Sequence, residues 1–173
     1  IQIGDNRQIA ITDSGYDVFQ KIKNGNGSFV TSYNSANTGS GVISAGQITN
    51  PGAWVPDTYT LTFVTPTTYE VRDSSSALIT SGTYQSDATI DFNGAQVAVS
   101  GTPAAGDVFT IAPSTSQDVF TTLQGLVTTL NAGATDPASR AKFSIDINQT
   151  LVSIDQAMNS MDNVRAGIGA RQN

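Results

Sequence analysis

The 173-residue chain contains neither cysteine nor histidine. Without Cys there can be no disulfide, no thiolate chemistry and no zinc site built on thiolates. Without His the chain lacks the commonest general base and the commonest transition-metal ligand. A Ser-His-Asp or Cys-His catalytic site is therefore impossible within this chain. We expect no cofactor, no metal and no enzymatic activity.

Charged residues are also scarce, at 13% of the chain, and the eight basic residues form no run. Nucleic acids and anionic membrane surfaces both require clustered Lys and Arg. No apolar run approaches the ~18 residues of a membrane span, and no cleavable signal peptide opens the chain. We therefore expect neither nucleic acid nor a membrane as a partner. The chain starts at Ile1, so we interpret it as an internal fragment of a longer protein.

The surface must be built mostly from Ser, Thr, Asn, Gln and Gly, because 13 of the 14 acidic residues are Asp and Glu70 is the single Glu. Such surfaces are typical of extracellular β-rich proteins and of filaments. The first eleven residues alternate apolar and polar positions around Gly4-Asp5-Asn6, which predicts a β-hairpin. Its apolar positions are Ile1, Ile3, Ile9 and Ile11.

Residues 13–24 predict a short helix or turn that buries Val18, Phe19 and Ile22. The stretch from 24 to 41 is rich in Asn, Gly and Ser and predicts a loop. From Val42 to Pro113 several short strands are separated by turns, which suggests a small sandwich or barrel-like domain. The expected strands are 58–63, 68–73, 77–79, 88–92, 96–100 and 107–111, with Asn93-Gly94 as a strong hairpin signal.

The apolar period then changes from that of a strand to that of a helix. Ser114 and Gln117 have the spacing of a capping box, and Gly133 is expected to end this helix. Its predicted apolar face comprises Val119, Phe120, Leu123, Leu126, Val127 and Leu130.

A second helix is predicted to start with Asp136 as N-cap and Pro137 in its first turn, and to run to the end of the chain. At ~1.5 Å per residue it would be roughly 50 Å long. Its apolar positions follow steps of four and three, as in a heptad seam. This seam comprises Ile147, Leu151, Ile154, Met158, Met161, Arg165 and Ile168.

A seam of this length needs a partner helix along most of it, and the chain supplies a second helix only about half as long. The alternative is a helix that lies across the β-domain with its seam buried as ordinary core. Arg165 has two interpretations: it extends its charge outward over a packed stem, or it pairs with an acid on a neighbouring helix or subunit. Trp54, beside Pro51-Gly52 and Pro56, is either a satellite-core residue or a carbohydrate-stacking platform.

The fold class is therefore α+β, with a small antiparallel β-domain inserted into a helical core domain that has a long C-terminal helix and a short β-hairpin. Residues 1–41 form the first part of the core domain, 42–113 the inserted β-domain, and 114–173 the second part of the core domain with two helices.

The end of the chain, residues 154–158 and 164–173, resembles the C-terminal signature of the flagellin family. The residues that carry this signature are Arg165, Ala166, Gly169, Ala170 and Asn173. The segment 100–114 and the helix start 117–120 resemble the hook-associated proteins of that family. Residues 56–63 and 68–71 fit the same group, and 14–19 fit best the members found where the hook meets the filament.

The resemblance implies a structural adaptor of the bacterial flagellum that joins the hook to the flagellin filament. Its implied partners are the hook-end hook-associated protein, flagellin, copies of itself in a ring, and an export chaperone. The implied location is extracellular, reached through the flagellar type III pathway without a cleaved signal peptide. The long N-terminal helix of the family is missing here, so the core domain is expected to be incomplete and the fragment to stay soluble instead of forming filaments.

Two other functions compete with the adaptor. A cell-surface adhesin or carbohydrate-binding β-module would use Trp54 and would leave the long helix unexplained. A glycosidase-like enzyme would need two placed carboxylates, and Asp87 and Asp91, four residues apart, would lie on one face of a strand. We rank the enzyme last, because two solvated aspartates near a turn are the simpler interpretation.

Overall fold

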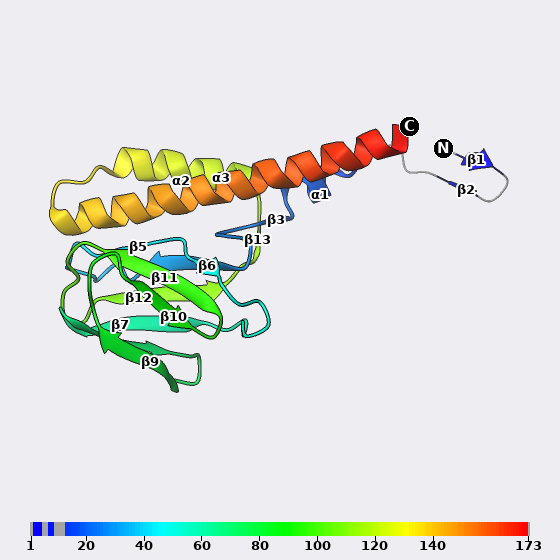
Figure 1. Cartoon of the computed structure of the whole chain (residues 1–173). Helices are drawn as coiled ribbons and strands as arrows, with labels where there is room; N and C mark the ends of the chain where they lie inside the picture. Colours follow the sequence, from blue (N-terminus) through cyan, green and yellow to red (C-terminus); the bar gives the residue numbers. More distant parts are fainter. Residues whose placement is uncertain (1, 5–6, 9–12, 173) are drawn as a thin grey trace.

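A layer of helices lies along one side of a β-domain in the computed structural model of the chain, which describes residues 2–4, 7–8 and 13–172 (Figure 1). The helices are α1 (Gly15–Phe19), α2 (Val119–Ala132) and α3 (Pro137–Gln172). A short connection turns the chain from α2 into α3, so the two helices lie side by side and antiparallel. The predicted α+β class is confirmed.

The β-domain is built from two antiparallel sheets. The larger has the order β4-β12-β7-β8-β9, and in the smaller β11 pairs with β10, β5 and β6. The larger sheet comprises β4 (Phe29–Tyr33), β7 (Tyr59–Thr65), β8 (Thr68–Arg72), β9 (Leu78–Thr83) and β12 (Val108–Pro113). The smaller comprises β5 (Val42–Ile43), β6 (Gln47–Ile48), β10 (Thr89–Phe92) and β11 (Ala95–Ser100).

The core lies between the two sheets because buried residues alternate with more exposed ones along strands such as β7, β10 and β11. Tyr59, Leu61 and Phe63 of β7 are fully buried, and their neighbours Thr60 and Thr62 are only half-buried. The two sheets supply most of the buried core: Phe29, Ile43, Val71, Ile90, Phe92, Ala95, Val97, Val99, Phe109 and Ile111. The six strands predicted from the sequence are all confirmed to within a few residues.

The Asn93-Gly94 hairpin is confirmed as well. Both residues have positive φ angles, 43° and 78°, as a tight turn of this kind requires. A Cβ on Gly94 would lie 2.3 Å from the carbonyl oxygen of Asn50, so this position excludes a side chain.

The prediction of a loop over residues 24–41 is wrong, because β4 lies within it and pairs with β12. Phe29 and Thr31 of β4 are buried between the sheets. β4 has only five residues and is surrounded by Asn, Gly and Ser. Its alternation of apolar and polar residues is therefore too short to recognise in the sequence. The larger sheet therefore already includes residues that the predicted boundary at 42 assigns to the core domain.

The β-domain is attached through a neck of two very short strands. β3 (Ile22–Lys23) enters the domain and pairs with β13 (Ser116–Gln117), which leaves it. Asn24 extends the pairing: its amide donates to the Thr115 carbonyl at 3.0 Å, and its side-chain oxygen accepts from the Thr115 amide at 2.9 Å. The two ends of the inserted segment are thus held side by side.

This neck corrects the predicted capping box. Gln117 belongs to β13, and the N-cap of α2 is Asp118, whose carboxylate accepts a hydrogen bond from the Phe120 amide. Gly133 ends α2 as expected, with φ of 68°. Asp136 caps α3 through two hydrogen bonds of 3.0 Å from the Ala138 and Ser139 amides, which confirms that helix start.

At the N-terminal end, β1 (Gln2–Gly4) pairs with β2 (Arg7–Gln8), which agrees with the predicted hairpin. Of its apolar positions, Ile1, Ile9 and Ile11 lie outside the described residues. Ser14 caps α1, and Ile22 is buried as predicted. Phe19 is exposed instead of buried, and its ring lies 6.3 Å from that of Phe120 on α2.

A buried carboxylate, that of Asp107, joins the loop between β4 and β5 to the loop between β11 and β12. Asp107 is 2% exposed, and its Oδ1 accepts a hydrogen bond from the Thr38 amide at 2.9 Å. Its Oδ2 accepts from the amides of Gly39 at 3.1 Å and Ala104 at 2.8 Å. Three backbone donors from two loops thus converge on one side chain, which compensates for its loss of hydration.

We predict that Asp107→Asn lowers the free energy of unfolding by about 2 kcal/mol, because the new amide NH₂ group would face backbone donors in a buried site. Urea unfolding followed by the fluorescence of Trp54 measures this change. Asp91→Asn is the matched control on an exposed aspartate and should shift stability by less than about 0.5 kcal/mol. Overlapping unfolding curves for Asp107→Asn and the original chain would contradict the role assigned to Asp107.

Candidate assembly surfaces

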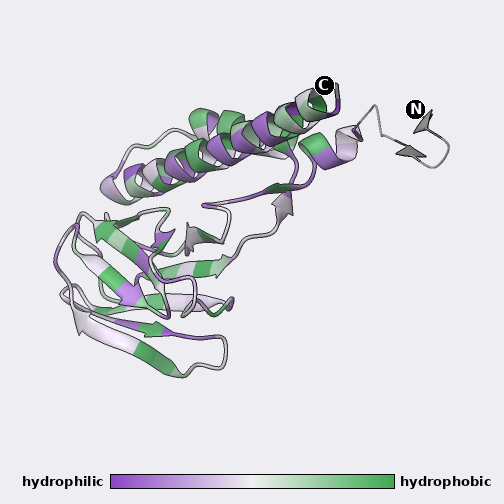
Figure 2. Cartoon of the chain, turned by 45° about the vertical axis from the view of Figure 1, so that its right-hand side comes forward, coloured by the Kyte–Doolittle hydropathy of each residue, from purple (hydrophilic) through white to green (hydrophobic). Residues whose placement is uncertain are grey.

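The helix layer exposes large apolar side chains. On α2 these are Phe120, Leu123, Val127 and Leu130, with Phe120 63% exposed. On α3 they are Leu151 and Met158, the latter 59% exposed. Green hydrophobic segments are visible on both helices in Figure 2. We call these six residues the apolar surface; so many large apolar side chains left in water on neighbouring helices are typical of an interaction surface.

The predicted apolar face of α2 is thus present, but most of it is in contact with solvent. The polar Thr122 is the residue of α2 that is buried. Val119 and Leu126 are half-buried. The helix therefore packs against the rest of the chain through one edge of its apolar face. The remainder of that face is exposed to solvent.

The predicted seam of α3 lies on a partly exposed side of the helix. Leu151, Met158 and Arg165 are exposed, and the other four members are half-buried: Ile147, Ile154, Met161 and Ile168. The buried residues of α3 are Ala141, Ile145, Ser153 and Ala157. These follow steps of four and eight on another side, so the seam is not the face that enters the β-domain core. That it packs on a partner helix stays a prediction.

The signature residues lie near the end of α3. Arg165, Ala166 and Ala170 are exposed, and Gly169 is half-buried. A Cβ on Gly169 would meet nothing within 4 Å. Asn173 lies outside the described residues. Arg165 thus directs its side chain into solvent, and whether it pairs with a neighbouring subunit stays a prediction.

A second set of contacts joins α3 to the edge strand of the β-domain. Tyr33 Oη donates a hydrogen bond of 2.9 Å to Asp146 Oδ2, and Lys142 Nζ donates one of 2.8 Å to the Ser35 carbonyl. Gln149 Nε2 donates to Thr31 Oγ1. The two segments are antiparallel in these contacts, because residue numbers rise along one segment as they fall along the other. We call the three pairs the polar ladder. These residues carry no signal in the sequence, because nothing in a single sequence links positions more than 100 apart.

Burial perturbs the central pair of the polar ladder. Desolvation raises the pKa of Tyr33 to about 12, and its hydrogen bond to Asp146 acts in the same direction. Desolvation also raises the pKa of Asp146, while the Tyr33 hydroxyl, as a donor to the carboxylate, lowers it. The Tyr33 proton is therefore held more tightly in the folded chain than in the unfolded one.

We predict that the original chain loses stability more steeply than Tyr33→Phe between about pH 10 and pH 12. The unfolded chain releases the tyrosine proton near pH 10, and the folded chain keeps it up to about pH 12. The stability contributed by this proton is thus complete below pH 10 and is lost as the pH rises through 12. Urea unfolding at a series of pH values checks this, and parallel curves for the two proteins would contradict it.

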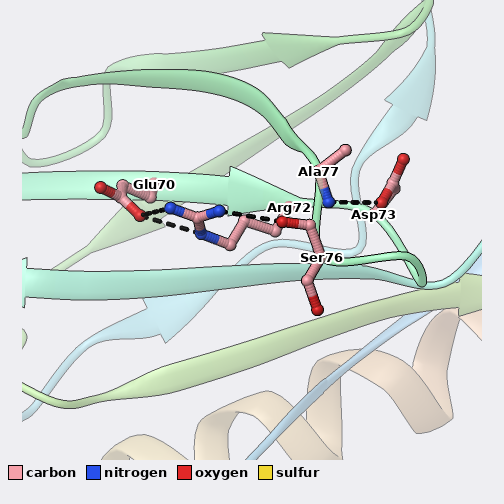
Figure 3. A network of polar contacts seen from close by, with 5 residues as sticks. All are labelled: Glu70, Arg72, Asp73, Ser76 and Ala77. Carbon is pink, nitrogen blue, oxygen red and sulfur yellow. Dashed lines mark hydrogen bonds and ion pairs between the residues drawn. The ribbon is translucent and has the colours of Figure 1, made fainter.

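The outer side of the β-domain carries an ordered polar network at the β8–β9 turn (Figure 3). Arg72 donates to Glu70 Oε2 from Nε at 3.0 Å and from Nη2 at 2.8 Å, and its Nη1 donates to the Ser76 carbonyl. Asp73 Oδ1 accepts from the Ala77 amide at 2.9 Å. These contacts fix a turn in which Ser76 has φ of 68°. The pair Glu70–Arg72 is part-exposed, so it contributes little to stability.

The geometry gives no support to a catalytic or carbohydrate site at the predicted positions. Asp87 lies in a turn with φ of 65°, before β10, so the prediction that it shares a strand face with Asp91 is wrong. Asp91 is exposed and accepts from Gln96. Trp54 packs 5.5 Å from the Phe29 ring and 5.8 Å from the Tyr59 ring, as a core residue does.

Within the part of the chain that the structure describes, no three acidic side chains gather closely enough to hold a metal ion. Over the same residues, no helix combines the length and the apolarity that crossing a bilayer requires.

Comparison with known proteins decides the family. The family model for Flagellar hook-associated protein 1, D2-like domain, matches residues 32–113, which begin within β4 and end with β12. The flagellar junction protein FlgL from Legionella pneumophila is 33% identical, with a TM-score of 0.93 over 99% of this chain. The chain belongs to the FlgL family of flagellar junction proteins.

Other solved structures of the FlgL family agree. FlgL from Xanthomonas campestris is 35% identical over 91% of this chain, with a TM-score of 0.86. The structure described as flagellar hook-associated protein-3 from Legionella pneumophila is 34% identical over 98% of the chain, with a TM-score of 0.92. The chain spans about half the length of these relatives, 52% to 57%. No curated protein sequence matches it.

Proposed function

We propose that the protein is a structural adaptor of the bacterial flagellum, joining the hook to the flagellin filament. The observation that carries this proposal is the apolar surface on a helix pair of a FlgL-family chain. Its six large side chains face water in the isolated chain. An adaptor needs such a surface, because helices of neighbouring segments and subunits must bury apolar area against one another to hold together.

The proposed partners follow from this role. The hook-end hook-associated protein contacts one end of a ring of copies of the chain, and flagellin contacts the other. Subunits in such a ring meet through non-identical, head-to-tail surfaces. The protein acts outside the cell, after export through the flagellar type III pathway with the help of an export chaperone. No metal or cofactor takes part.

The proposed domain division assigns 1–41 and 114–173 to the helical core domain and 42–113 to the inserted β-domain. The neck supports an insertion, since β3 and β13 pair where the chain enters and leaves the β-domain. β4 belongs to the larger sheet, so we propose one change to this division: the inserted domain starts just after the neck and not at residue 42.

The first experiment is electron microscopy of cells that lack the gene. Because an adaptor must be present before flagellin can add, we expect bare hooks and flagellin shed into the medium. Normal filaments on these cells would overturn the adaptor role.

Variants of the apolar surface test which residues carry that role. Phe120→Asp with Val127→Asp, tested in the gene-deleted cells, should leave the chain folded because both residues are exposed, yet reduce filament-bearing hooks at least tenfold. Asn159→Asp, at an exposed polar position on α3, should restore filaments fully. Full restoration by the double variant would show that the apolar surface is not used in assembly.

We also propose that part of the apolar surface is covered by a helix from outside this chain, as the family resemblance implies for the segment before it. Joining that helical segment to the chain should raise the melting temperature by several degrees, because burying a large apolar side chain contributes roughly 1.5–3 kcal/mol. Differential scanning calorimetry measures this. The same segment with its apolar face changed to Ser is the control, and equal melting temperatures would contradict the proposed cover.

A further inference from the structure

The contact between α3 and the β-domain combines one large apolar side chain with several polar ones. The α3 residues that are buried, or that belong to the polar ladder, are mostly small or polar. They are Ala141, Lys142, Ile145, Asp146, Gln149, Ser153 and Ala157. Among the described residues, Ile145 is the member of α3 that joins the hydrophobic core cluster of the β-domain. Burial of one Ile and two Ala gives a weak apolar contribution compared with the core between the two sheets.

The rest of this contact is made of hydrogen bonds that water can replace. Lys142–Ser35 is exposed, and Tyr33–Asp146 and Gln149–Thr31 are only part-buried. Such bonds contribute little net free energy, because both partners bond to water when they separate. Gln149 Oε1 is buried and accepts no hydrogen bond from any described residue, so this end of the contact is incompletely satisfied.

There is also room beside the contact. A groove of about 800 Å³ lies between α2 and α3, and Asp146 and Gln149 line it together with Phe120, Gln124 and Thr128. Two of the three ladder residues on α3, Asp146 and Gln149, therefore border open space, which leaves room for a change of rotamer on that side. A closely packed interface would not permit this.

The covalent connection is narrow as well. The chain enters and leaves the β-domain through β3 and β13, two residues each, which pair with one another. The domain has its own core, to which the two sheets contribute nearly all of the buried residues. It can therefore stay folded while its contact with α3 opens.

We propose that α3 holds the β-domain by a releasable latch, formed by Ile145 and the polar ladder. When the latch opens, the β-domain turns as a unit about the two-stranded neck. The latch thus sets the orientation of the β-domain on the helix layer, and a neighbouring molecule that competes for Ile145 or the ladder residues changes that orientation. This device is a property of the chain itself, whatever assembly the chain joins.

The test is a distance measurement between two spin labels. Because the chain contains no Cys, Ser81→Cys on β9 and Asn159→Cys on α3, both exposed, take one label each. Double electron–electron resonance then gives the distribution of distances between the β-domain and α3. The open-latch variant adds Lys142→Ala, Tyr33→Phe, Gln149→Ala and Ile145→Ala. A ladder-only variant keeps Ile145.

The matched control removes the same kinds of side chain elsewhere. It carries Arg140→Ala, Tyr69→Phe, Asn148→Ala and Ile147→Ala, none of which belongs to the latch. We expect the width of the distance distribution to rise at least twofold in the open-latch variant, by a smaller factor in the ladder-only variant, and not at all in the control. The near-ultraviolet circular dichroism of Trp54 should stay unchanged in all of them.

Two results would overturn the latch. One is an unchanged distribution in an open-latch variant that keeps the Trp54 signal, since other contacts would then fix the orientation. The other is loss of the Trp54 signal together with an unchanged distribution in the ladder-only variant. Ile145 would then be an integral part of the β-domain fold, and not a releasable contact.

Discussion

The pairing of β3 with β13 is the constraint on which the rest of the molecule depends. It brings residues 22–23 beside residues 116–117, almost a hundred positions further along the chain. Everything between them folds into two sheets with one core, and everything after them returns to the helix layer. Without this pairing, α2 would not start beside α1, and the ring of Phe19 would not reach that of Phe120.

The two layers are stabilised in different ways. The β-domain is held by an apolar core with buried aromatic rings, such as Phe63, which meets Tyr84 and Phe109 edge-on. The helix layer has little core of its own, and most of the apolar face of α2 is in water. This asymmetry fits the proposed adaptor, in which the helices would obtain their remaining packing from neighbouring molecules and the β-domain would be stable before assembly.

Local signals in the sequence predicted local structure well. Asn93-Gly94 gave its hairpin, and Asp136-Pro137 gave the start of α3, because each signal acts on its own backbone within a few residues. β4 was missed because a five-residue strand is stabilised by its partner β12, about 80 positions away in the sequence. The capping box failed for a similar reason, since the pairing of β13 with β3 delays the start of α2 to Val119.

The surfaces of α3 were likewise predictable only in part, because their contacts join residues far apart in the sequence. Periodicity identified α3 and its seam, but it could not say which side of the helix meets the β-domain. That side is marked by Ala141, Ile145 and Ala157, two of which are too small to give an apolar signal. The polar ladder has no periodic signature at all, since Tyr33 and Asp146 are 113 positions apart.

The neck has one more consequence, for how such a protein can change over time. Because the entry and exit strands lie side by side, the distance that any insert must bridge at this point is short and independent of the insert's size. A larger, smaller or differently decorated domain can occupy the same place without moving α2 or α3. The outer surface of the β-domain is therefore free to diverge, while α2 and α3 keep their geometry.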